Sequence, residues 1–148
     1  MGAGHVSAVA TGPSRRAEHG ARARRSTMAA LDAASDARAA AREALEANVY
    51  QDPRISAPWL DLIALVRQGE NVDDVRDVYD RFFEYFPQAS TQWMDYIDWE
   101  LSHSNFEQVN AIFTRCLRNT MSVDLWKMYL AYTRRVNPLP PFTAEENS

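Results

Sequence analysis

Apolar side chains recur along most of this chain with the spacing of amphipathic helices. Residues 93–101 are apolar at positions 93, 96, 97 and 101, a spacing that gathers these side chains on one face of a helix. Segments 56–67, 71–86, 105–117 and 122–136 carry similar stripes. Turn-forming and capping residues separate them, so the chain is predicted to be a series of short helices.

The apolar stripes also recur along the sequence at a nearly constant interval. Trp59, Trp93 and Trp126 follow one another at intervals of 34 and 33 residues. The second half of the unit repeats too, since Val75 and Tyr79 lie 34 residues before Val109 and Phe113. Periods of this length are typical of stacked helical hairpins. The predicted fold is therefore all-α: an α-α superhelix, or solenoid, with about two and a half repeats plus an opening helix.

Local signals place the helix boundaries. Strong helix formers from about Ser35 to Asn48 predict the opening helix. Ser56, followed by Pro58, is predicted to cap the next helix, and Asn71 and Asn105 are predicted to cap the second helix of each hairpin.

Residues 1–28 differ from the rest in composition. They hold five arginines and one acidic residue, with no apolar periodicity, and are predicted to be a disordered Arg/Ala-rich leader. Three specific roles stay open: an organellar transit peptide, a nuclear localisation patch at Arg22, Arg24 and Arg25, or untranslated sequence before a start at Met28.

Residues 29–137 are predicted to form the helical array, and residues 138–148 a Pro-rich and acidic tail. Within the tail, Thr143 to Glu146 has the form of a capping box that opens a helix. The next helix is therefore expected to be truncated, and the chain is expected to be a fragment or a short isoform. Without that helix, the inner stripe of residues 122–136 is expected to stay exposed as an apolar patch: Trp126, Tyr129, Leu130 and Thr133. No run of 18 apolar residues is present that could cross a bilayer.

Residues 1–28 have a net positive charge, whereas residues 29–148 have a net negative charge. The formal charge is −4, but residues 29–148 hold 11 basic and 19 acidic side chains, so this body is predicted to bind RNA only weakly. Four of the acids, at i, i+4, i+7 and i+11, align on one helix face. We call them the acidic ridge: Asp73, Asp77, Asp80 and Glu84. The ridge is interpreted as a solvated face partly paired with arginines, or as a docking surface for a basic protein.

Glu100 lies within an apolar stripe, where an unpaired carboxylate would be costly. It is predicted to accept hydrogen bonds from an arginine or from free backbone N–H groups of a neighbouring hairpin, with the repeat-related Arg81 and Arg115 as the candidate arginines. No second carboxylate, histidine or nucleophile is tied to it by spacing, and no cofactor or metal motif is found, so the protein is predicted not to be an enzyme. The single cysteine, Cys116, is interpreted as an apolar filler in the core.

Aromatic residues and a buried acid at fixed positions in each unit resemble the half-a-TPR (HAT) repeat of RNA-processing proteins. Some positions depart from its pattern, with Val66 and Thr133 in place of the glutamate and Asn110 in place of an arginine. The resemblance implies structural roles, holding hairpins together, for the motif residues Trp59, Arg76, Tyr79, Arg81, Pro87, Trp93, Tyr96, Glu100, Phe113, Arg115, Trp126 and Tyr129.

The order of these motifs over about residues 40–136 resembles the amino-terminal part of the suppressor-of-forked family, the large HAT subunit of the cleavage stimulation factor. The resemblance implies a non-catalytic scaffold in pre-mRNA 3′-end cleavage and polyadenylation, located in the nucleus. The implied partners are other protein subunits of that machinery, with RNA association indirect. The family's homodimer region lies beyond the repeats present here. An organellar HAT protein, in a plastid or mitochondrion, and a splicing HAT scaffold stay as alternatives.

Overall fold

The computed structural model of the protein describes residues 1–5, 12 and 14–140. These residues form helices and no strand, which confirms the predicted all-α fold. The six helices are α1 (Arg15–Gln51), α2 (Ser56–Arg67), α3 (Val72–Tyr85), α4 (Ser90–Ser102), α5 (Phe106–Asn119) and α6 (Val123–Val136). The chain divides into two compact units, residues 1–47 and 48–148, which are described separately below.

The first unit is built on the long helix α1, which begins much earlier than predicted. Ser14 caps it, because its Oγ accepts from the Ala17 N–H at 3.4 Å. Its carbonyl oxygen also accepts from the Ala17 and Glu18 N–H groups at 2.8 and 3.1 Å. The prediction that residues 1–28 are disordered is therefore wrong for residues 15–28. No described side chain from Arg15 to Ala47 is buried. Alanine and arginine are strong helix formers, and helical hydrogen bonds are local, so this segment can be helical without a core.

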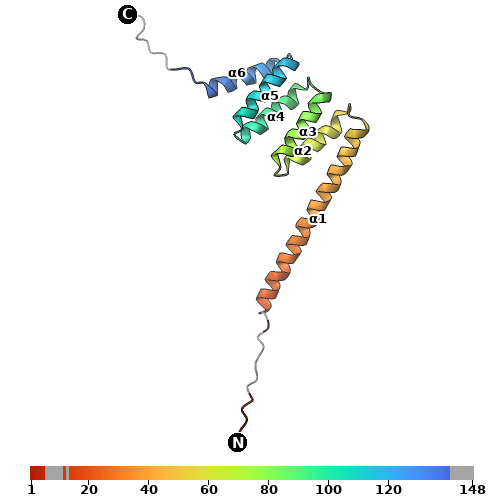
Figure 1. Ribbon diagram of the computed structural model, residues 1–148, viewed down its shortest axis with the longest axis vertical. Helices are drawn as coiled ribbons and strands as arrows, with labels where there is room; N and C mark the ends of the chain where they lie inside the picture. The colour runs from red at the N-terminus through yellow and green to blue at the C-terminus, as the bar shows by residue number, and fades with distance from the viewer. Residues whose placement is uncertain (6–11, 13, 141–148) are drawn as a thin grey trace, which may run out of the picture. The chain divides into compact units, whose positions relative to one another are not determined.

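The second unit contains the last turn of α1 and two antiparallel hairpins, α2–α3 and α4–α5. Figure 1 shows these helices followed by α6, which contacts both α4 and α5. A tight turn joins α2 to α3, where a Cβ on Gly69 would lie 3.3 Å from the Val66 carbonyl oxygen. The predicted array boundary at residue 137 follows the end of α6 at Val136. Residues 141–148 of the predicted tail lie outside the described residues.

The helix starts follow the predictions only in part. As predicted, the Asn71 side chain accepts from the Asp73 and Asp74 N–H groups at 3.1 and 3.4 Å. Ser56, in contrast, is already the first residue of α2 and does not cap it. Asp52 holds this turn instead, because its carboxylate accepts from the Arg54 N–H at 3.2 Å.

Asn105 occupies the predicted cap position of α5, but its side chain makes no capping hydrogen bond. The turn before it is held by the backbone. Ser104 has a φ of 56°, in the left-handed region, and the Asn105 N–H donates to the Glu100 carbonyl oxygen at 3.2 Å. Backbone hydrogen bonds at the end of α4 therefore fix the turn, and the predicted Asn105 cap of α5 is not formed.

The face that α6 buries is not the predicted one. Its core side chains are Leu125 and Tyr132, which are 0% and 6% exposed. Trp126 and Leu130, which belong to the stripe predicted to lack its partner helix, are 47% and 51% exposed. Adjacent helical positions differ by about 100° around the axis, and contact with both α4 and α5 turns the face of Leu125 inward. The predicted exposure of the stripe therefore holds for Trp126 and Leu130, but the side of α6 that packs on α4 and α5 is not the predicted one.

Candidate functional site

Two repeat-related tryptophans have the same surroundings. Trp59 and Trp93 are 2% and 1% exposed, and each indole N–H donates to a proline carbonyl oxygen six residues earlier, at 2.9 Å in both cases. Arg81 lies over the Trp59 ring and Arg115 over the Trp93 ring, at 5.3 and 5.4 Å from the ring centroids. Each tryptophan therefore packs between the turn before its own helix and an arginine of the next one.

Trp126, the third tryptophan of the series, is in a different environment. It is 47% exposed and contacts Tyr129, with 6.0 Å between the ring centroids. Tyr129 in turn packs edge-on against the buried Phe113 at 5.2 Å. Together these three aromatic side chains line an open groove of about 500 Å³ between α5 and α6, with Asn110, Thr114, Leu117 and Arg118.

Facing side chains of α3 and α4 form a ladder across the turn at Pro87. Phe83 stacks on Trp93 with 3.4 Å between ring centroids, and Tyr79 stacks on Tyr96 at 4.3 Å. Partners on this ladder lie at similar distances in sequence before and after the proline, as in any antiparallel pair. Burial raises the pKa of the Tyr96 hydroxyl to about 12, so this side chain stays neutral at physiological pH.

Arg76 and Glu100 form the next step of the ladder. Glu100 is fully buried, and its two carboxylate oxygens accept from Arg76 Nε at 2.7 Å and Nη2 at 3.1 Å. This bidentate donation to the Glu100 carboxylate raises the pKa of Arg76, so the arginine stays charged. The prediction that Glu100 is buried against an arginine is confirmed.

The two arginines named for that role have other partners. Arg81 Nη1 lies 3.5 Å from a carboxylate oxygen of Asp77, one turn earlier in the same helix. Arg115 Nη1 lies 2.7 Å from Asp80 and so joins α5 to α3. The prediction of Arg81 or Arg115 as the partner of Glu100 is therefore wrong. The antiparallel register across Pro87, which places Arg76 opposite Glu100, is the signal that repeat spacing alone missed.

The acidic ridge lies on the exposed side of α3. The side chains of Asp73, Asp77 and Asp80 are 92%, 64% and 48% exposed, and each lies within 3.5 Å of an arginine. Glu84 is exposed as well. The interpretation of a solvated face partly paired with Arg76 and Arg81 therefore describes the geometry. Only Asp80, which Arg115 contacts from another helix, is also part of the packing between helices.

The described part of the chain contains neither a metal-binding cluster nor a membrane-spanning helix. No cluster of three His, Cys, Asp or Glu side chains that could hold a metal ion occurs there. Among the same residues, no helix is long and apolar enough to span a membrane. His103 lies just after α4, where its Nδ1 is 2.7 Å from the Trp99 carbonyl oxygen.

Cys116 is fully buried in α5, as predicted. Burial raises the pKa of its thiol from 9.0 to about 11, and only the thiolate is strongly nucleophilic. At pH 8 the native thiol should therefore react with iodoacetamide about a hundred times more slowly than in urea-unfolded protein. Mass spectrometry of timed samples measures both rates. Equal rates would show that Cys116 is accessible in the native protein, against the interpretation of a core filler.

The model of the suppressor of forked protein family matches residues 40–148. The mRNA 3′-end-processing protein rna-14 of Neurospora crassa is 43% identical over 101 residues, covering 68% of this chain and 9% of that protein. The mRNA 3′-end-processing protein RNA14 of Yarrowia lipolytica is 38% identical over 95 residues, covering 64% and 12%.

The protein suppressor of forked of Drosophila melanogaster is 32% identical over 72 residues, which cover 47% of this chain and 9% of that protein. No solved structure matches. The chain therefore spans about a tenth of the length of the curated relatives that it matches.

Proposed function

The chain belongs to the suppressor of forked family, and on this premise we propose that its helical array is a non-catalytic protein-interaction scaffold in pre-mRNA 3′-end cleavage and polyadenylation. The observation that carries the proposal is that its relatives in several fungi are named mRNA 3′-end-processing proteins. The proposed location is the nucleus, and the proposed partners are other protein subunits of the processing machinery.

The surroundings of the motif residues support a scaffold role. Most aromatic side chains of the first two units are buried against one another, which leaves only Tyr85 and Phe106, 47% and 51% exposed, available in these helices to stack on RNA bases. Glu100, the acid most deeply placed in the array, is held by Arg76. Residues 29–148 also carry an excess of eight acidic side chains, 19 against 11 basic ones, which opposes contact with phosphates. We infer that RNA associates with this array through partner proteins.

The acidic ridge is the proposed contact surface for a basic partner protein. Asp73, Asp77 and Glu84 are exposed and contact no other helix through a recorded ion pair in the described residues. Asp80 is excluded from this group because its pair with Arg115 joins two helices. Charge complementarity across an interface speeds association and selects partners, so the three exposed acids are the residues whose neutralisation should affect binding but not folding.

Neutralising these acids should weaken capture of the processing machinery. We expect the variant Asp73→Asn, Asp77→Asn, Glu84→Gln to recover several-fold less of the cleavage and polyadenylation subunits from nuclear extract after chemical cross-linking. The matched control is Asp61→Asn, Asp98→Asn, Glu107→Gln, which removes the same number of exposed acids from three other helices. Quantitative mass spectrometry of the cross-linked proteins measures the difference.

Two outcomes would count against the proposal. If the ridge variant and the control variant recover equal amounts of the polyadenylation subunits, the ridge is excluded as the contact surface. The scaffold role would still stand in that case, because the subunits are still recovered. Recovery of splicing or organellar RNA-processing proteins in place of polyadenylation subunits would contradict the scaffold role itself. Circular dichroism melting of each variant shows whether the substitutions leave the fold unchanged.

A further inference from the structure

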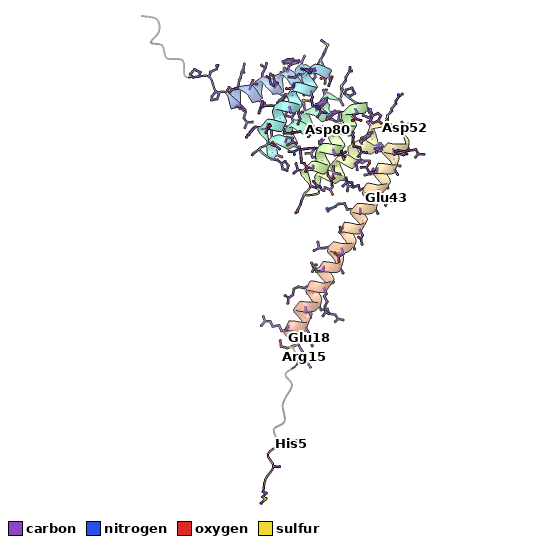
Figure 2. All side chains as sticks on the ribbon, viewed as in Figure 1. His5, Arg15, Glu18, Glu43, Asp52 and Asp80 are labelled. Carbon is purple, nitrogen blue, oxygen red and sulfur yellow. The ribbon has the colours of Figure 1, made fainter. Side chains whose placement is uncertain are left out.

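The first three turns of α1 carry a concentration of positive charge that the helical array does not use. We call residues 15–25 the basic segment; it contains five arginines and a single acid, Glu18. Figure 2 shows Arg15 and Glu18 in the first turn of α1. All five arginine side chains are exposed. No ion pair is recorded for any of them within the described residues, although Arg24 Nε donates to the Gly20 carbonyl oxygen at 3.3 Å.

The arginines are not confined to one face of the helix. Successive helical residues are about 100° apart, so Arg15 and Arg22 lie on nearly the same side, while Arg24 lies on the opposite side. Arg16 projects between these two directions. A flat anionic surface would contact only one of these sides. A flexible or grooved polyanion, in contrast, can follow the helix and reach arginines on several sides at once.

The basic segment also lacks an apolar anchor. From Arg15 to Thr27, alanine is the largest apolar side chain. Specific protein interfaces have an apolar core with aromatic or large aliphatic anchors, and helices that bind membrane surfaces need an apolar face. Neither feature is present in this segment. Its ligand must therefore be recognised by charge and by hydrogen bonds from guanidinium groups.

Guanidinium chemistry restricts the ligand to one that presents carboxylate or phosphate oxygens, and a nucleic-acid backbone presents phosphates along its whole length. Arginine presents a planar fork of N–H donors that matches phosphate oxygens in bidentate fashion. All five cationic side chains of the segment are arginines. We propose that residues 15–25 of α1 form an RNA-binding arm that contacts the phosphate backbone. The phosphate contact is argued from the segment itself, whereas the choice of RNA over DNA rests on the proposed function in pre-mRNA processing.

The arm and the array then have separate roles. The array, with its acidic excess, contacts proteins, and the basic segment contacts the RNA on which those proteins act. This division adds a direct RNA contact to the indirect association proposed for the array. The two are distinguishable by experiment, because neutralising the segment should lower RNA binding while leaving capture of protein subunits unchanged.

Salt-dependent RNA binding by the full chain tests the arm. The test is fluorescence anisotropy with a labelled U-rich strand and a labelled RNA hairpin. For the single strand, the slope of log affinity against log salt should be about −3.5, since each of five phosphate contacts contributes about −0.7. In the variant Arg22→Gln, Arg24→Gln, Arg25→Gln, the slope should become shallower by about 2. Glutamine keeps the helix propensity, so the change isolates the charge.

Two matched variants control for charge and for fold. Arg118→Gln, Arg134→Gln, Arg135→Gln removes three exposed arginines from α5 and α6 and should leave RNA affinity within twofold. Replacing Arg22, Arg24 and Arg25 by lysine keeps the charge and should preserve most of the salt slope. Cross-linking of the glutamine variant of the basic segment to polyadenylation subunits should be unchanged, which separates this test from that of the array.

Several results would overturn the proposal. RNA binding that is weak in the unmodified chain, or that is reduced equally by both glutamine variants, would exclude a dedicated arm. Equal affinity for DNA of the same sequence and form would contradict the assignment to RNA. Binding of the basic segment to an acidic protein without RNA affinity would also contradict it. Peptide mapping of native protein should find Arg15 to Arg25, and their absence would remove the arm altogether.

Discussion

Replacing Arg76 with methionine is expected to lower the free energy of unfolding by about 3 kcal/mol, because it leaves the Glu100 carboxylate buried without a partner. This value is at the lower end of the range for buried ion pairs, since the Arg76 side chain is 24% exposed whereas that of Glu100 is 0% exposed. Urea denaturation followed by far-ultraviolet circular dichroism measures the change.

The double variant Arg76→Met, Glu100→Leu should recover most of that loss, because an apolar pair of similar volume needs no hydrogen bonds. Val66, which lies 34 residues before Glu100, already shows an apolar side chain buried at the equivalent position. Arg115→Met serves as a further control and should cost only about 1 kcal/mol, because the pair that it breaks is half exposed. A loss on Arg115→Met larger than that on Arg76→Met would contradict the assigned pairing.

Replacing Trp93 with alanine should destabilise the protein by about 3–5 kcal/mol, as for other buried aromatic side chains. The indole is 1% exposed, stacks on Phe83, donates to the Pro87 carbonyl oxygen and is covered by Arg115. Its removal leaves a cavity between α3, α4 and α5, together with an unpaired carbonyl oxygen. The same urea denaturation measurement gives the change.

Trp126→Ala is the matched control for this prediction. The substitution is identical and the position is repeat-related, but the side chain is 47% exposed, so we expect a loss of about 1 kcal/mol or less. A comparable loss at both positions would show that Trp126 is buried in solution, for example by self-association. Sedimentation analysis over a range of concentrations would detect such association.

The contrast between Trp93 and Trp126 shows that repeat-related residues need not have the same surroundings. The motif places the same residue in each unit, but burial depends on which neighbouring helices surround it. In the first two units, Arg81 and Arg115 of the following helix cover the rings. In the third, the groove beside Trp126 is open within the described residues. The repeat motif therefore determines which residue is present, while the neighbouring helices determine how much that residue stabilises the fold.

Sequence reasoning determined much of the fold. The 34-residue spacing and the apolar stripes predicted the helices of residues 56–136 and their hairpin order, because helix periodicity is a local property of the chain. The burial of Glu100 against an arginine followed from its position in a stripe and from the cost of burying a charge. The family resemblance, which rested on the order of the motifs, is confirmed by the match over residues 40–148.

Only the tertiary structure decided which side chains meet. Arg76 and Glu100 pair because the antiparallel register of α3 and α4 places them opposite each other, whereas repeat spacing relates residues that occupy equivalent positions and need not touch. The rotation of α6, which buries Leu125 and exposes Trp126, is set by its contacts with α4 and α5. Helix periodicity defines a stripe to within a residue or so, but the packing of neighbouring helices decides which edge of that stripe is buried.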